Sequence, residues 1–202
     1  MTSHPAIALL EFDSIAVGMR AGDGMAKRAP LATLKAGTVH PGRYLILVGG
    51  EVAPVEEAYL EGQRLGEDML IDKIFLPEVH PNAYAAALGQ RSSAAYDTLG
   101  VIETQWLPAA LHAADAGIKG ASVEVLELRL GDGLGGKGLL LLGGDIADVQ
   151  AGVEFAVAAA NEHRCEVRHS VIPSLAEEMV AELRGASRFF GAHGVSNDGG
   201  AR

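Results

Sequence analysis

The chain is poor in cysteine: Cys165 is the only one among 202 residues. One thiol cannot form an intramolecular disulfide, so a disulfide framework is excluded and a reducing, cytoplasmic setting is expected. The first residues, Met1 to Pro5, lack the basic start of a signal peptide. Apolar runs such as Leu139 to Leu142 are far too short to span a bilayer.

Basic residues are also scarce, since 16 Lys and Arg stand against 26 Asp and Glu, for a formal net charge of −10. An acidic chain lacks the electrostatic footprint of nucleic-acid binding, and an anionic membrane surface would repel it. Hydrophobic residues make up 49% and charged residues 21%, which is an ordinary globular mixture. We therefore expect a folded body with neither nucleic acid nor membrane as a partner.

The sequence repeats itself. At an offset of 92, Glu11 falls on Glu103, and a motif Asp-x-x-x-Lys-x-Ala that begins at Asp23 recurs at Asp115. A two-residue insertion changes the offset to 94, where Gly49-Gly50 matches Gly143-Gly144. At the original offset, Val79-His80-Pro81 aligns with Val171-Ile172-Pro173. Three matches in one order indicate an internal duplication, which predicts two similar domains.

Each half shows the same order of expected elements. Hydrophobic periodicity, turn residues and helix-end signals predict β-α-β-β-α-β plus a short helix in both, an α/β (α+β, ferredoxin-like) fold. In the first half the strands are expected at 7–12, 31–39, 44–48 and 70–76, and the helices at 15–28, 52–65 and 83–88. In the second half the strands are expected at 99–104, 123–130, 138–142 and 165–172, and the helices at 108–119, 147–160 and 175–183. The predicted domains are residues 6–89 and 97–184, joined by Gln90 to Tyr96 and followed by a flexible tail, 185–202.

The Gly-rich segment Gly131 to Gly138 fits parts of two phosphate-binding patterns. It contains the Gly-x-Gly-x-x-Gly of dinucleotide-binding loops and most of a P-loop, but Gly138 stands where a P-loop has Ser or Thr. Both patterns need a helix after the loop, because the helix N-terminus holds the phosphate. Here the loop leads into an apolar run that predicts a strand. A hairpin or pore-lining loop is therefore favoured.

The other candidate groups favour structural roles over catalysis. The seven histidines are scattered with no metal-binding spacing, and no serine has a nucleophile-elbow context, so no catalytic residue is assigned. Cys165 lies in an apolar segment and is expected to be buried and inert. Because Glu11 and Glu103 recur at equivalent places, a repeated hydrogen bond or interface contact is favoured over an acid–base pair. Lys27 and Lys119 likewise suggest a repeated contact.

Taken together, these motifs resemble the bacterial microcompartment shell domain. The resemblance rests on Leu10-Glu11 and Ile102-Glu103, on the two Asp-x-x-x-Lys-x-Ala motifs, on Gly-Gly-Glu/Asp-Val/Ile-Ala-x-Val twice and on Val-x-Pro twice. It covers roughly Ala6 to Leu183, and two fused copies make the chain similar to the tandem-domain shell trimers of the propanediol-utilisation type.

The resemblance implies a structural protein and not an enzyme: a homotrimer that acts as a pseudohexamer, tiles into a shell with hexamers and pentamers, and leaves a central pore for metabolites. The tile-edge lysines are expected to be Lys27 and Lys119. The pore-lining residues are expected to be His40, Pro41, Gly42, Arg43, Leu134, Gly135 and Gly136.

One departure from the family concerns cofactors. A cluster-bearing member has a Cys-Pro-Gly-Lys turn, whereas this chain has His40-Pro41-Gly42-Arg43. Because iron–sulfur clusters need thiolates, no cluster and no other cofactor is expected. Two alternatives remain for three copies of His40 around an axis: a metal ion held by neutral imidazoles, which would suit electron transfer, or a cationic ring with Arg43 that attracts anions. A third hypothesis, from fold analogy alone, is a small-molecule regulator with a polar pocket between the halves.

Overall fold

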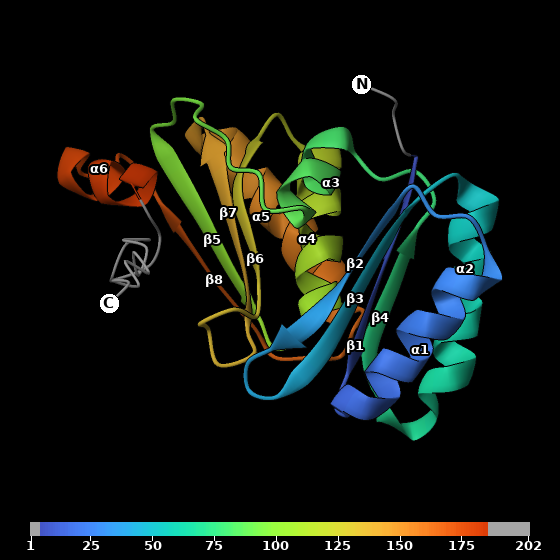
Figure 1. Ribbon diagram of the computed structural model, residues 1–202. Helices are drawn as coiled ribbons and strands as arrows, with labels where there is room; N and C mark the ends of the chain where they lie inside the picture. Colours follow the sequence, from blue (N-terminus) through green and yellow to red (C-terminus); the bar gives the residue numbers. More distant parts are fainter. Residues whose placement is uncertain (1–4, 186–202) are drawn as a thin grey trace, which may run out of the picture.

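Two four-stranded antiparallel sheets form the framework of the computed structural model, which describes residues 5–185 (Figure 1). The first sheet has the order β2-β3-β1-β4 and the second the order β6-β7-β5-β8. The first unit consists of β1 (Ala6–Phe12), α1 (Ile15–Arg28), β2 (Thr33–Val39), β3 (Arg43–Gly50), α2 (Val52–Gly66), a 3-10 turn (Glu67–Met69), β4 (Leu70–Leu76) and α3 (Pro81–Ala87).

The second unit repeats the order of the first. It consists of β5 (Thr98–Thr104), α4 (Leu107–Gly120), β6 (Glu124–Leu130), β7 (Gly138–Gly144), α5 (Ile146–Asn161), β8 (Val167–Ile172) and α6 (Glu177–Gly185). The predicted fold class, two tandem β-α-β-β-α-β units each ending in a short helix, is therefore confirmed. The predicted tail lies almost entirely outside the described residues. Among residues 5–185, no helix combines the length and apolar character needed to cross a membrane.

Strand β1 shows how the core of the first unit is divided. All seven of its residues are buried, because side chains alternate between two covered faces. Ala8 and Leu10 pack with helices α1 and α2, whereas Ile7 and Leu9 join a core cluster shared with the second unit. Glu11 follows Ile7 and Leu9 in the same alternation. Its carboxylate is thus directed toward the second unit.

The two units share one continuous apolar core. In Figure 1, α1 and α2 cover the outer face of the first sheet, and α4 and α5 lie between the two sheets. The shared cluster joins Leu76, Val79 and Ala83 of the first unit to Leu111 and Leu140 of the second. The counterpart of α3, helix α6, lies at the far end of the molecule and has no buried residue.

Strand register corrects one part of the sequence alignment. Ile7 pairs with Leu76 in the first sheet, and Leu99 pairs with Ile172 in the second. Likewise the Val79 N–H binds the Pro5 carbonyl, and the Leu175 N–H binds the Asp97 carbonyl. The offset in this region is therefore 96. The alignment of Val79-His80-Pro81 with Val171-Ile172-Pro173 was wrong, because a second two-residue insertion, between α5 and β8, produces a similar tripeptide out of register.

Candidate functional site

The two turns predicted to line a pore lie against each other. The β2–β3 turn contains a cis peptide bond between His40 and Pro41, and Gly42 follows with a φ of 107°. A Cβ added to Gly136 of the β6–β7 loop would lie 2.8 Å from Pro41 Cδ, so only a glycine allows this approach. Of the residues predicted to line a pore, His40, Pro41, Gly42 and Gly135 are exposed, Leu134 is partly buried and Gly136 is buried. One chain thus brings one turn of each kind to the same place.

The Gly-rich loop is a hairpin connection. It joins β6 to β7, so a strand and not a helix follows it, and the context for phosphate binding is absent at this loop. Gly131, Gly133, Gly135 and Gly136 all have φ between 62° and 90°, which residues with a Cβ rarely adopt. Turn geometry therefore accounts for the glycines.

Arg43 differs from the rest of its turn, because its guanidinium is held inside the molecule. Its Nη1 donates to Glu11 Oε1 over 2.7 Å, and its Cζ lies 4.9 Å from the ring centroid of Trp106 in the second unit. His40 has an acidic neighbour as well, with 3.7 Å between its Nδ1 and Asp132 Oδ1. Arg43 is therefore paired with Glu11 inside the chain, and a cationic ring of His40 and Arg43 around an axis stays a prediction.

Glu11 is the centre of the contact between the two units. Its side chain is fully buried, and its Oε2 accepts a hydrogen bond of 2.8 Å from the main-chain N–H of Leu107. Leu107 is the first residue of α4, whose N-cap Trp106 provides no side-chain acceptor. The carboxylate of one unit thus caps a helix of the other. Burial raises the pKa of Glu11, although Leu107 and Arg43 act in the opposite direction.

Glu103, the repeat counterpart of Glu11, has a different environment. It accepts a hydrogen bond from Lys137 over 2.7 Å, which reproduces the Arg43–Glu11 pair. However, 39% of its side chain is exposed, and no main-chain N–H reaches it within the described residues. The prediction of a repeated structural contact is confirmed for the ion pair, whereas the helix cap is present only once.

The repeated aspartate and lysine also form equivalent pairs. Lys27 contacts Asp23 and Lys119 contacts Asp115, each over 2.6 Å and four residues apart on a helix. The second pair does more, because Asp115 accepts the main-chain N–H of His80 over 2.7 Å and Lys119 donates to the Glu78 carbonyl. Lys119 thus joins the two units inside one chain. A role for either lysine at a tile edge stays a prediction.

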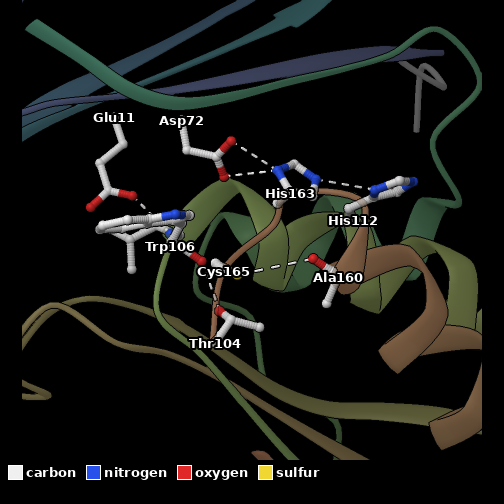
Figure 2. A network of polar contacts seen from close by, with 9 residues as sticks. Glu11, Asp72, Thr104, Trp106, His112, Ala160, His163 and Cys165 are labelled. Atoms are coloured by element: carbon white, nitrogen blue, oxygen red, sulfur yellow. Dashed lines mark hydrogen bonds and ion pairs between the residues drawn. The ribbon is translucent and has the colours of Figure 1, made fainter. Parts of the chain in front are cut away.

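Three further polar side chains link the units, as Figure 2 shows. His163 Nδ1 lies 2.8 Å from an Asp72 carboxylate oxygen, and His163 Nε2 lies 3.2 Å from His112 Nδ1. With Asp72 ionised, His163 donates to it from Nδ1 and accepts from His112 at Nε2. Sequence reasoning missed this group because 51 and 91 residues separate its members.

Two of the side chains drawn in Figure 2, His112 and Cys165, have surroundings that favour their uncharged forms. Burial, and then the neighbouring His163, lower the pKa of His112. Burial also raises the pKa of the Cys165 thiol, whose Sγ lies 3.9 Å from the Ala160 carbonyl. A raised thiol pKa disfavours the reactive thiolate, which agrees with the expectation of an inert cysteine. The expectation that Cys165 is buried is met only in part, since its side chain is half-buried. Within residues 5–185, no group of three or more potential ligands could hold a metal ion.

A groove of about 450 Å³ runs between strands β2 and β6. Lys35 and Val39 line it from the first unit, and Arg129 and Asp132 from the second. Arg91 and Glu127 also line the groove and form an ion pair, with 3.2 Å between Arg91 Nη2 and Glu127 Oε2. A groove with polar groups between the halves is what the small-molecule hypothesis requires, and that hypothesis stays a prediction.

Known proteins resemble this chain over most of its length. It is 37% identical over 178 residues to the bacterial microcompartment shell protein PduT of Citrobacter freundii, which covers 88% of this chain and 97% of the relative. It is 29% identical over 194 residues to the carboxysome assembly protein CcmO of Synechocystis sp., covering 88% of this chain and 64% of the relative.

Solved structures show the same fold. A microcompartment protein from Desulfitobacterium hafniense DCB matches with a TM-score of 0.79 at 35% identity, over 89% of this chain and 99% of the other. The fused permuted hexameric shell protein of the RMM microcompartment matches with a TM-score of 0.56 at 22% identity, over 79% and 85% of the two chains.

A family model decides the assignment. The model described as the BMC domain matches this chain twice, over residues 6–79 and 98–175, which together cover most of its length. The first match begins at the first residue of β1 and ends after β4, and the second begins at the first residue of β5 and ends after β8. Each match therefore coincides with one structural repeat. The chain belongs to the family of bacterial microcompartment shell proteins with two BMC domains in tandem.

Proposed function

We propose that this chain is a structural building block of a microcompartment shell, which assembles as a homotrimer and tiles with other shell proteins. The observation that carries the proposal is the pairing of the two turns: His40-Pro41-Gly42 and Leu134-Gly135-Gly136 lie side by side in one chain. Three chains in a ring would bring six turns of alternating kind to one axis, which would form a pore.

The buried polar groups between the two units hold them together. Glu11 caps helix α4, and Asp72 accepts from His163. A rigid contact between the units suits a protein whose task is to keep a fixed shape in a layer. The chain therefore acts as a structural component of the shell. Its individual function is to determine which metabolites pass through the pore.

The experiment is a measurement of mass followed by imaging. Untagged protein should have the mass of a trimer in sedimentation equilibrium, and electron microscopy at high concentration should show flat sheets or rounded assemblies. A chain that stays monomeric across the micromolar range contradicts the proposal.

A metal ion on the pore axis is the second candidate, because His40 is exposed at the tip of its turn. Three imidazoles from three copies are suitable ligands for zinc, copper or iron. An iron–sulfur cluster does not fit, since the turn has no thiol and the thiol of Cys165 lies against Ala160. Elemental analysis of protein purified without a histidine tag tests this candidate. Metal that is bound by the native chain and lost in His40→Ala supports it, and metal-free native protein contradicts it.

A further inference from the structure

Two imidazole rings of the second unit direct ring nitrogens toward each other. His112 lies on helix α4, and His163 lies in the turn that follows helix α5. The facing nitrogens, His112 Nδ1 and His163 Nε2, are 3.2 Å apart (Figure 2). The ring planes are inclined by 71°, so the rings do not stack. Neither ring belongs to the turns that we propose to line a pore.

The distance between these nitrogens fits a metal ion held by both. Zinc binds an imidazole nitrogen at about 2.0–2.1 Å and prefers a tetrahedral arrangement, in which two ligand nitrogens lie about 3.4 Å apart. The observed 3.2 Å differs from this value by only a few tenths of an ångström. An ion between the rings therefore needs only a small movement of the two side chains.

The positions of the ring protons also suit a metal ion. With Asp72 ionised, its carboxylate holds the proton of His163 on Nδ1, 2.8 Å away, which leaves a lone pair on Nε2. In the metal-free chain, His112 Nδ1 donates to that lone pair. When His112 carries its proton on Nε2 instead, both facing nitrogens offer lone pairs to one ion. The neutral ring changes between these two tautomers without losing a proton.

Asp72 provides the contact that metal-binding histidines usually have on their other nitrogen. Such a contact orients the ring and makes the coordinating nitrogen more basic. The side chains of Asp72 and His163 are only 12% and 7% exposed, so water competes little for this hydrogen bond. The main-chain N–H of His163 also binds the Ala160 carbonyl over 3.1 Å, which fixes the turn that carries the ring. His163 is therefore oriented before an ion arrives.

The first unit shows that the fold does not require imidazole at this place. Arg20 is the counterpart of His112, and it donates to the Leu65 carbonyl at the end of helix α2. Its Nη2 also lies 3.6 Å from Glu67 Oε1. An ordinary hydrogen bond and ion pair thus join the two helices of the first unit. The paired imidazoles of the second unit are an addition to this arrangement.

We propose that His112 Nδ1 and His163 Nε2 together bind a divalent transition-metal ion of the kind that prefers imidazole, zinc above all, with Asp72 orienting His163. The site is separate from the turns around a pore and goes beyond the shell role. Within residues 5–185 no third protein ligand joins the pair, so water completes the coordination beside His112, which is partly exposed. Two protein ligands bind an ion less tightly than the four of a structural zinc site, so the ion is exchangeable.

Bound metal strengthens the contact between the two units. Asp72 belongs to strand β4 of the first unit, whereas both ligands belong to the second. A cation on Nε2 withdraws electron density from the ring and makes the Nδ1–H of His163 a stronger donor to Asp72. An ion that binds the folded chain in preference to the unfolded one also raises the free energy of unfolding. The chain should therefore resist urea better with zinc than without it.

Zinc chloride, added to untagged protein stripped of metal by a chelator, is the probe. Titration calorimetry should show one ion per chain at this site, and the urea midpoint should rise with zinc concentration. His112→Gln and His163→Gln each remove a ligand and should abolish that rise. Asp72→Asn keeps both ligands and should weaken zinc binding about tenfold or more. His169→Gln, on the exposed part of strand β8, is the matched control and should bind zinc as the native chain does.

His40→Ala separates this site from a metal ion on the pore axis. The variant should keep one zinc ion per chain, because His40 contributes nothing to the pair on α4 and the turn after α5. Loss of all zinc in His40→Ala, or zinc binding by His112→Gln and His163→Gln that equals the native chain's, overturns the inference.

A measurement on the native chain covers the case in which a variant does not fold. Anomalous diffraction at the zinc edge, from crystals grown with zinc chloride, should show a peak between His112 Nδ1 and His163 Nε2. A native chain without such a peak overturns the inference. The shell role depends on the assembly of the chain, so it stands or falls separately from each of these results.

Discussion

The two copies of the repeat place the same glutamate in opposite environments. Glu11 is fully buried and binds both Arg43 and the start of helix α4, whereas Glu103 binds Lys137 at a partly exposed site. Both occupy the same register, with Glu11 opposite Leu45 of β3 and Glu103 opposite Leu139 of β7. What differs is the neighbour: a helix of the same chain covers the first glutamate, and the described part of the chain leaves the second uncovered.

The two copies show that a repeated motif predicts which side chains contact each other more reliably than it predicts how much the contact contributes to stability. Both Asp-x-x-x-Lys motifs make the same ion pair, yet the side chain of Asp115 is 6% exposed and that of Asp23 is 63% exposed. An exposed pair contributes little to stability, whereas a buried group that loses its partner is costly. The same substitution in the two copies should therefore have unequal effects.

The largest difference is expected between Glu11→Ala and Glu103→Ala. Glu11→Ala leaves the Leu107 N–H and the largely buried Arg43 without their acceptor, and should lower the free energy of unfolding by about 3 kcal/mol. Glu103→Ala removes a partly exposed pair and should cost less than about 1 kcal/mol. Urea unfolding of both variants at the same protein concentration measures this difference. Equal losses would contradict the comparison.

A smaller effect is expected where the two cores differ in packing. Gly100 is the counterpart of Ala8, and a Cβ at Gly100 would lie 2.7 Å from Val153 Cγ2 and 3.0 Å from Val149 Cγ1. Gly100→Ala should therefore lower the free energy of unfolding by about 1–2 kcal/mol through overpacking. Gly37→Ala is the control, since nothing lies within 4 Å of its Cβ position, and it should show no such loss in the urea midpoint.

A pH-dependent difference is expected from His112, whose counterpart is Arg20. Because burial lowers the pKa of His112, the unfolded chain binds more protons than the folded one below the ordinary histidine pKa of about 6.5. The contribution of the uncharged His112 to the free energy of unfolding is complete above that pH. It is lost as the pH falls toward the pKa of His112 in the folded chain. The urea midpoint should therefore decrease between pH 7.5 and 5.5. His112→Gln should reduce that decrease, and His169→Gln, on exposed β8, should leave it unchanged.

The smallest effect is expected at the two turns that we propose to line a pore. His40→Leu gives the first turn the chemistry of Leu134 and removes an exposed contact with Asp132, so the free energy of unfolding should change by less than about 0.5 kcal/mol. Thermal unfolding monitored by circular dichroism checks this value. A loss of 2 kcal/mol or more would show that the turn also stabilises the fold.

Much of the fold was predictable, because local patterns determine it. Helix α1 and strand β4 begin and end where their periodicity predicts, and the other elements agree within a few residues. The role of Glu11 as a structural contact was predictable from its recurrence, but its partner Leu107 was not, since 96 residues separate them. The pairing of Asp72 with His163 could not be predicted from the sequence, because 91 residues separate them and each alone resembles an ordinary polar side chain.

The sequence by itself determined the duplication, the order of elements in each half and the family that both imply, because periodicity and glycine positions act over short distances along the chain. Only the tertiary structure decided which glutamate is buried, which tripeptides are equivalent and which faces lack a neighbour. Burial depends on the surface that lies opposite a side chain, and that surface comes from a distant part of the chain. Glu11 is buried because helix α4 lies opposite it, and Glu103 is partly exposed because no helix within the described residues occupies the equivalent place.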